Sequence, residues 1–282
     1  MKYYATSAEL LKKLLPEVEI MAHKVNKNDN VSSGFFALDK ITNGFSKGEL
    51  ILVSVRPGMG KTSFMLSLLS NISILQKKSV VIFSLERTAE KLIQRLIESE
   101  TGQSISKINS GKTNLSKHER IKHRLINISN SNIKIFHNPV YLIDDLTFIL
   151  KSFDDEQVSD IVFIDYLELI KNVSTTEDEN EKKAEIINLL KKTAKEISIP
   201  IIVFSQIPEH EMFNWQMKNI PFEKSPKYFH YSDTVMYLCR TAPSDNYAVN
   251  DNFIEIIVSK HFDNTEPQIA YINYINAIDR FV

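Results

Sequence analysis

The 282-residue chain contains one cysteine, and no stretch of its sequence approaches the length of a membrane span. Cys239 cannot form an internal disulfide bond, and its position in the apolar run "TVMYLCR" indicates a buried, inert thiol rather than a nucleophile. The first residues include no apolar signal region. These absences argue against a disulfide-rich secreted domain and a membrane protein, and they predict a cytoplasmic protein.

An excess of charge of one sign is also lacking. The 34 basic and 35 acidic residues leave a formal net charge of −1, so the chain as a whole has no basic signature of nucleic-acid binding. Any site for DNA must therefore be a local patch. Hydrophobic residues make up 43% of the chain, which is enough to form a sizeable core.

Glycine is scarce, with seven residues in the whole chain, yet two of them lie in the short segment "RPGMGKTS" (56–63). A strand-like run precedes this segment and an amphipathic helical stretch follows it, which is the context of a phosphate-binding loop. In such a loop, backbone N–H groups surround phosphate oxygens, Lys61 supplies a positive charge, and the Thr62 hydroxyl reaches Mg²⁺. The full pattern has a further glycine where this chain has Val55. An ordinary turn between a strand and a helix is therefore the alternative interpretation.

Three further strand-like runs deliver polar side chains at their carboxyl ends. The run "IVFIDY" contains Asp165, a carboxylate that can support Mg²⁺ beside the phosphate loop. The run "VVIFSLE" ends in Glu86, which can orient and deprotonate the water that attacks a γ-phosphate. The run "IPIIVFSQ" ends in Gln206, an amide that can hydrogen-bond the γ-phosphate. Each residue has a plain structural alternative, but their occurrence together favours a nucleotide-hydrolysing site.

Strand-like and helical patterns alternate along most of the chain. We expect strands at 49–55, 79–85, 133–136, 161–166, 199–206, 234–240, 253–260 and 269–275, and helices at 61–76, 89–101, 116–128, 142–153 and 181–198. This alternation predicts an α/β fold with a mainly parallel sheet covered on both faces. The strands from residue 234 onward follow one another without helices, which predicts antiparallel pairing there.

Residues 1–30 differ in pattern from residues 31–282, and we interpret them as a separate linker segment. A T-x-x-E capping box at Thr6 precedes apolar residues spaced by three and four up to Val25, with Pro16 inside the run. The narrow apolar seam of this segment can pack either on its own domain or on a neighbouring subunit.

The ordered motifs "RPGMGKT", "FSLE" and "IDYLELI" give the chain a specific resemblance to the C-terminal motor domain of DnaB-type replicative DNA helicases, from about Gly34 to Phe281. The resemblance implies a RecA-like P-loop ATPase fold. It also implies a homo-oligomer, a hexameric ring that hydrolyses ATP with Mg²⁺ to move along single-stranded DNA, together with replication partners. The N-terminal segment is similar to the family's linker helix, which docks on the next subunit.

The resemblance assigns roles to individual residues. Lys61 and Thr62 would bind phosphate and Mg²⁺, Asp165 would support the metal, Glu86 would be the catalytic base, and Gln206 would sense the γ-phosphate. The residues that it places at the nucleotide are Arg56, Pro57, Gly58, Met59, Gly60, Lys61, Thr62, Ser63 and Arg240. Arg56 and Arg240 could equally be surface arginines.

The sequence also departs from the family pattern. Where the family has an arginine that reaches the neighbouring subunit's ATP, the run "KHF" has Phe262, which leaves Lys260 as the trans-acting candidate. An arginine finger contributes 10³–10⁵ in rate in related enzymes, so this replacement predicts slow turnover. Glu168 stands where the family usually has glutamine.

The segment expected to face DNA, "PFEKSPKYFHYSD" (221–233), is another departure. It interleaves cations with aromatic residues, and Lys224, Lys227 and Tyr228 are its candidates for contact with single-stranded DNA. The alternative is that the aromatic residues pack against the sheet.

Two functions from different classes are therefore open. The first is a DnaB-like helicase motor, which the complete set Lys61, Thr62, Glu86 and Asp165 favours. The second is a slow or non-unwinding ATP-binding regulator of a DNA-processing complex. Phe262, and the absence of a counterpart of the family's N-terminal collar domain, favour that alternative.

Overall fold

The structure is a computed structural model that describes residues 29–110, 115–137, 141–153, 159–172, 176–206, 225–240 and 253–282. The chain divides into two units, Met1–Asn30 and Val31–Val282, and the fold described below is that of the second unit. The linker helix predicted within residues 6–25 lies outside the described residues.

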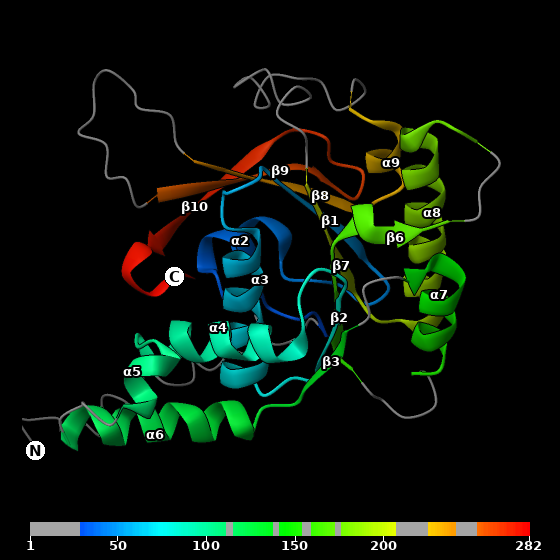
Figure 1. Cartoon of the computed structure of the whole chain (residues 1–282). Helices are drawn as coiled ribbons and strands as arrows, with labels where there is room; N and C mark the ends of the chain where they lie inside the picture. The colour runs from blue at the N-terminus through cyan, green and yellow to red at the C-terminus, as the bar shows by residue number, and fades with distance from the viewer. Residues whose placement is uncertain are drawn as a thin grey trace, which may run out of the picture. The chain divides into compact units, whose positions relative to one another are not determined.

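A nine-stranded sheet forms the centre of the second unit in the described part of the chain (Figure 1). Its spatial order is β11 (Arg280–Phe281), β10 (Gln268–Ile275), β9 (Phe253–His261), β8 (Thr234–Arg240), β1 (Leu50–Val55), β7 (Ile201–Gln206), β5 (Ile161–Asp165), β2 (Val80–Ser84) and β3 (Ile133–His137). The strands from β8 to β3 are parallel, whereas β9, β10 and β11 pair antiparallel. The predicted α/β fold class and its antiparallel C-terminal part are confirmed, with β8 itself parallel to β1.

Helices cover both faces of this sheet (Figure 1). One face carries α2 (Phe36–Thr42), α3 (Lys61–Leu69) and α4 (Ala89–Thr101), and the other carries α7 (Ile143–Lys151) and α8 (Glu179–Ile197). Successive residues of β1 alternate between the two cores, since Leu52 packs on the α7–α8 side and Val53 packs on the α3 side. Burial on both faces explains why the central strands are continuous apolar runs rather than alternating ones.

Most predicted elements are present, and the differences lie in short or irregular segments. The helix predicted at 61–76 begins as α3 and continues as a π-helix, Ser70–Leu75. α6 (Leu115–Ser129) confirms the helix predicted at 116–128. Among the elements that the sequence pattern did not predict are α2, α5 (Ile105–Asn109), α9 (Lys227–His230), β11 and the two-stranded pair β4 (Tyr141–Leu142) and β6 (Ile170–Lys171). Their lengths are too short to show a periodicity.

The short strand β11 is tied to the helical layer by a buried carboxylate. Glu100, on α4, accepts from Arg280 Nη1 at 2.7 Å and from Arg124 Nη1 on α6 at 3.1 Å, and it also accepts from the Ser70 hydroxyl. A buried carboxylate is stable only when such partners surround it. These contacts fix the C-terminal strand against the helices that follow the phosphate loop. None of the helices in the described residues is long and apolar enough to cross a membrane.

Candidate nucleotide-binding site

The loop between β1 and α3 has the backbone that its glycines predict. Gly58 and Gly60 have φ of 77° and 90°, in the left-handed region that side chains with a Cβ disfavour. A Cβ at Gly60 would also approach Phe281 Cζ to 3.3 Å. Lys61, Thr62 and Ser63 then open α3 with their side chains buried. The loop therefore directs the N-terminus of α3, with its free N–H groups, into the site.

The sheet register brings the other predicted residues to the same edge. Val55, the last residue of β1, pairs with Gln206 at the end of β7. Ser84, the last residue of β2, pairs with Asp165 at the end of β5, and Glu86 follows two residues later. Because these strands are parallel, their carboxyl ends meet beside the phosphate loop, as expected from the sequence.

The Lys61 ammonium lies among three groups at this edge. Its Nζ is 2.8 Å from Asp165 Oδ1, 3.2 Å from Glu86 Oε2 and 3.5 Å from the centre of the Tyr166 ring. Lys61 is 7% exposed, and Glu86 is 35% exposed at the mouth of the site. The buried ammonium therefore connects the carboxylate expected to support the metal with the carboxylate expected to act as base.

Asp165 has the properties of a carboxylate that supports a cation. Its side chain is fully buried, and Oδ2 has no hydrogen-bond partner among the described residues. Burial raises the pKa of the Asp165 carboxyl, and the neighbouring Lys61 ammonium only partly offsets this. Mg²⁺ prefers oxygen ligands and is usually held by one or two carboxylates together with phosphate oxygens. Asp165, together with Thr62, which follows Lys61 in α3, therefore fits a bound Mg²⁺.

Glu168 stabilises the end of β7, although it departs from the family pattern. Its two carboxylate oxygens accept from the Ser205 hydroxyl at 2.6 Å and from the Gln206 backbone N–H at 3.2 Å. Lys183, on α8, lies 3.5 Å from the same carboxylate. These contacts fix the backbone of Gln206, which lines the site.

The phosphate loop, Glu86 and Gln206 line part of a cavity of about 360 Å³. Its lining residues are Pro57, Gly58, Met59, Gly60, Lys61, Thr62, Ser63, Glu86, Arg87, Arg95, Gln206, Ile254, Tyr274, Asp279 and Phe281. This volume is in the range of small-molecule sites. Lys61, Thr62, Glu86 and Gln206, which are far apart in the sequence, are brought together as predicted.

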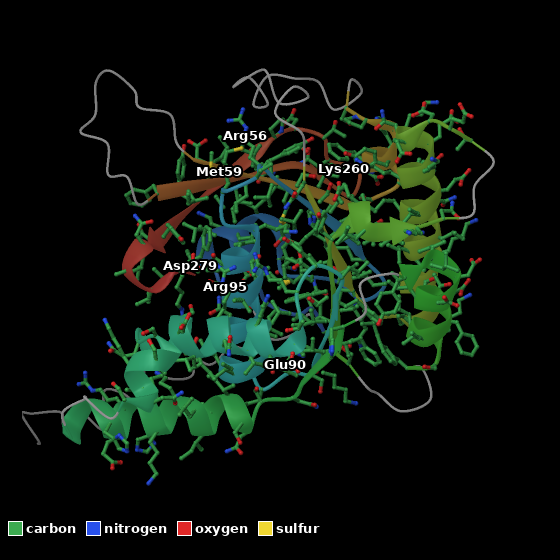
Figure 2. The ribbon with its side chains drawn as sticks, viewed as in Figure 1. Arg56, Met59, Glu90, Arg95, Lys260 and Asp279 are labelled. Carbon is green, nitrogen blue, oxygen red and sulfur yellow. The ribbon has the colours of Figure 1, made fainter. Side chains whose placement is uncertain are left out.

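Sequence reasoning missed one wall of the cavity. Asp279 accepts hydrogen bonds from the hydroxyls of Ser63 and Tyr274 and forms an ion pair with Arg95 of α4. Figure 2 shows Arg95 and Asp279 directed toward one another from these separate elements. Because 216 residues separate Ser63 from Asp279, no local pattern predicted the contact. The Phe281 ring lies beside this group and packs edge-on against Phe64 of α3, with their centres 5.4 Å apart.

The two arginines assigned to the nucleotide are not among the residues that line the described cavity. Arg56 is half-buried at the start of the loop, and its backbone carbonyl accepts from the Met59 backbone N–H at 3.1 Å. Arg240 is the last residue of β8, and its side chain lies outside the described part. Their role at the nucleotide stays a prediction.

Lys260 and Phe262 lie at the opposite edge of the sheet from the phosphate loop. Thr234, which begins β8, pairs both with Ile51 near the start of β1 and with His261 of β9, whereas the loop follows Val55. Four residues of strand separate the two ends by roughly 13 Å. These residues therefore cannot reach the phosphate loop of their own chain, and a role at ATP would require a second subunit.

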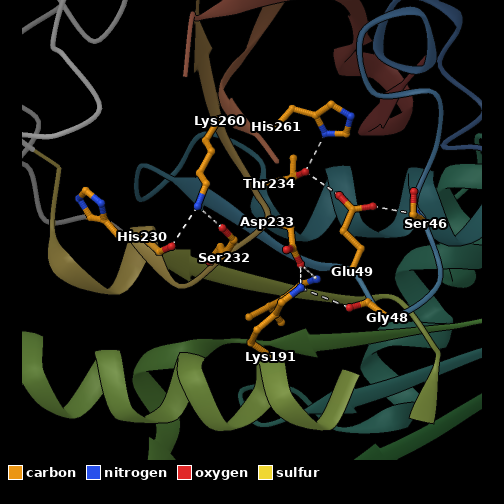
Figure 3. A network of polar contacts seen from close by, with 11 residues as sticks. Ser46, Gly48, Glu49, Lys191, His230, Ser232, Asp233, Thr234, Lys260 and His261 are labelled. Atoms are coloured by element: carbon orange, nitrogen blue, oxygen red, sulfur yellow. Dashed lines mark hydrogen bonds and ion pairs between the residues drawn. The ribbon is translucent and has the colours of Figure 1, made fainter. Parts of the chain in front are cut away.

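The Lys260 ammonium is held within its own chain (Figure 3). It donates to the backbone carbonyls of His230 at 2.9 Å and Ser232 at 2.6 Å. Phe262 is 42% exposed, and its ring packs on His261. A trans-acting Lys260 therefore stays a prediction that requires these carbonyl contacts to be exchanged for phosphate.

A second polar group lies at this edge, around the residue that precedes β1 (Figure 3). Glu49 is 2% exposed and accepts from the Ser46 backbone N–H at 2.7 Å and from the Thr234 hydroxyl at 2.5 Å. The same hydroxyl lies 2.9 Å from His261 Nδ1. Burial raises the pKa of Glu49 to about 7, and the hydrogen bond from Thr234 offsets only part of this effect.

The proposed stacking of Tyr228 on DNA bases is corrected by the structure. Tyr228 and Phe229 are each 1% exposed and belong to the core between the sheet and α8, so the alternative interpretation holds for them. Lys227 is 76% exposed and lies 3.6 Å from Glu181. Lys224 lies outside the described residues. Aromatic residues at the start of a short helix fill a core here, and the sequence offered no periodicity to show it.

The comparison with known families decides which class of ATPase carries this site. The DnaB-like helicase C terminal domain matches residues 30–282. The chain belongs to this family. A replicative DNA helicase DnaB from Treponema pallidum is 34% identical over 71% of this chain and 46% of its own length. The chain spans about half the length of the curated DnaB relatives it matches.

Solved structures show the same fold for this DnaB-like domain. A structure of a DnaB-like replicative helicase and its interactions with primase aligns with a TM-score of 0.78 and 25% identity, over 96% of this chain and 66% of that one. A second solved structure, described as an ATPase domain, aligns with a TM-score of 0.77 and 26% identity, over 96% of this chain and 98% of that one. The resemblance stated from the sequence motifs is thereby confirmed for the family and the fold.

Proposed function

We propose that the chain is the motor domain of a replicative DNA helicase, which hydrolyses ATP to move along single-stranded DNA. The observation that carries this proposal is the position of the Lys61 ammonium, 2.8 Å from Asp165 and 3.2 Å from Glu86, in a cavity that Gln206 also lines. Family membership supplies the second support.

The chemistry follows from the placement of these groups. The N–H groups of residues 58–62 and the Lys61 ammonium bind the β- and γ-phosphates of ATP. The oxygen of a water forms a bond to the γ-phosphorus, the bond to the bridging oxygen breaks, and ADP leaves with the bridging electron pair. Glu86 accepts the water proton, because it lies at the mouth of the cavity where water enters. Gln206, the last residue of β7, forms a hydrogen bond to the γ-phosphate, so loss of the phosphate removes a contact at the end of this strand.

Asp165 and Thr62 would hold the Mg²⁺ that accompanies ATP, directly or through its bound water. When bound, the ion neutralises phosphate charge, which favours attack at phosphorus. The remaining contributions come from the chain itself. When ATP binds, the Lys61 ammonium exchanges its contact with Asp165 for the phosphates. The Asp165 carboxylate is then free to support the ion.

The assembly that fits these residues is a ring of identical subunits, with six subunits in the family pattern. In such a ring the edge that carries Lys260 and Phe262 faces the neighbouring phosphate loop, and Phe262 cannot supply the charge of an arginine. Turnover is therefore limited by chemistry. Single-stranded DNA, and a primase like the one named for a structural relative, are the proposed partners in the cytoplasm.

A regulator that binds ATP without unwinding DNA is the second candidate, because Phe262 replaces the arginine and Lys260 is held by two carbonyls. ATP turnover measured with and without single-stranded DNA separates the two. The motor predicts turnover that DNA stimulates and that Lys61→Ala abolishes through loss of nucleotide binding. Nucleotide binding without DNA-dependent turnover would favour the regulator, and no nucleotide binding would contradict both.

A further inference from the structure

The cavity contains an arginine for which the family pattern assigned no role. Arg87 directly follows Glu86 and lines the same cavity as the phosphate loop and Gln206. Its backbone is fixed, because its carbonyl accepts from the Ser84 hydroxyl at 2.6 Å at the end of β2. The turn that presents the base therefore also holds Arg87 at the site.

The guanidinium of Arg87 has no counter-ion in the described part of the chain. Its Nε is buried without a hydrogen-bond partner. Arg95, the other arginine that lines the cavity, differs because it is paired with Asp279. A buried N–H group without a hydrogen-bond partner is costly. An anion bound in the cavity would complete the hydrogen bonds of the Arg87 guanidinium.

Arg87 lines the same cavity as Lys61, Thr62 and Glu86, so it belongs to the site where the reacting groups gather. A planar guanidinium can hold two oxygens of a phosphate at once, which an ammonium cannot.

We propose that Arg87 contacts the γ-phosphate of ATP bound to its own chain and stabilises the transition state of hydrolysis. This inference rests on the proposed ATPase function. As the water oxygen bonds to the γ-phosphorus and the bond to the bridging oxygen breaks, negative charge spreads over the γ-phosphate oxygens. Arg87 receives this charge while Glu86 takes the proton. Arginines supplied within a chain perform this role in other phosphoryl-transfer enzymes. Arg87 thus supplies a guanidinium from within the subunit, where Phe262 offers none from the neighbour.

The first test compares Arg87→Met with Arg87→Lys and with Arg120→Met, a control at an exposed arginine on α6. Arg87→Met should lower kcat by at least about tenfold, since an arginine finger contributes 10³–10⁵ in related enzymes. Arg87→Lys should recover part of this loss, and Arg120→Met should match the wild type. Affinity for ATPγS should fall at least about fivefold in Arg87→Met while affinity for ADP is retained, because only ATPγS carries a γ-phosphate group. Retained ADP affinity also shows that the variant is folded.

The second test distinguishes action in the same chain from action on a neighbour. Arg87→Met is mixed in equal amounts with Lys61→Ala, whose subunits keep Arg87 but cannot bind ATP. The proposal predicts no turnover above that of Arg87→Met alone, and recovered turnover would overturn it in favour of a trans role. Unchanged kcat and an unchanged preference for ATPγS over ADP would overturn the proposal outright. A wild-type chain that binds neither nucleotide would instead overturn the proposed ATPase function, and this assignment with it.

Discussion

Phe281 connects the C-terminal strand to the phosphate loop, and its removal tests whether that strand supports the site. The Phe281 side chain is 1% exposed, and its ring centre lies 5.4 Å from that of Phe64 and 4.9 Å from that of Tyr274. A Cβ on Gly60 would also contact this ring. Its backbone N–H donates to the Ser67 hydroxyl at 3.0 Å, so β11 is fixed on α3. The Phe281→Ala substitution leaves this backbone contact and removes the ring.

The expected cost follows from burial and ring contacts. Truncation of a fully buried phenylalanine to alanine lowers the free energy of unfolding by about 3–5 kcal/mol, part of which comes from the cavity left behind. The two ring contacts contribute about 0.5–1.5 kcal/mol each within that sum. Because the ring also limits the space behind Gly60, the loop loses a rigid support and its affinity for ADP falls.

Urea denaturation followed by circular dichroism measures the first effect, and ADP titration of the folded variant measures the second. The matched control is Phe148→Ala, because Phe148 is 77% exposed on α7 and its truncation should change stability by no more than about 0.5 kcal/mol. A Phe281→Ala loss as small as that of the control, with unchanged ADP affinity, would refute the structural role of β11.

Three further predictions concern the opposite edge and the N-terminal segment. Burial raises the pKa of Glu49 from 4.5 in the unfolded chain to about 7 in the folded protein. The contribution of Glu49 to the free energy of unfolding is therefore fully present below pH 4.5 and is lost as the pH rises through 7. The free energy of unfolding of the wild type should therefore fall by about 3 kcal/mol relative to Glu49→Gln over this range, and parallel curves would contradict the burial argument. Phe262→Arg should raise kcat more than about tenfold. This gain should depend on protein concentration and should be larger when it is introduced into the Arg87→Met variant. An unchanged kcat in a confirmed ring would place the trans-acting group elsewhere. Deletion of residues 6–25 should convert an oligomer to folded monomers in light scattering, whereas an unfolded product would show that the segment packs on its own domain.

The sequence predicted the parts of this site that depend on local pattern. The phosphate loop and the strand ends at Glu86, Asp165 and Gln206 could be predicted because each follows an apolar run, and parallel strands bring their carboxyl ends together. The wall formed by Asp279 and Arg95 could not, since its contacts join residues about 180 or more positions apart through a turn without periodicity. The choice between the two interpretations of Tyr228 could not be made from the sequence for a related reason. A short aromatic run has the same composition whether it fills a core or faces solvent, and only its burial against α8 decides between these.

The central claim, that Glu86 is the base of an ATPase, is tested most directly by Glu86→Gln. The amide keeps the shape of the side chain and loses the proton acceptor, and general base catalysis contributes 10²–10⁴ in rate. We expect the affinity for ATP to remain close to that of the wild type while the rate of single-turnover hydrolysis falls at least about a hundredfold. Lys61→Ala, prepared in parallel, measures the hydrolysis that does not come from this site. Hydrolysis by Glu86→Gln at the wild-type rate would contradict the assignment of the base and the mechanism built on it.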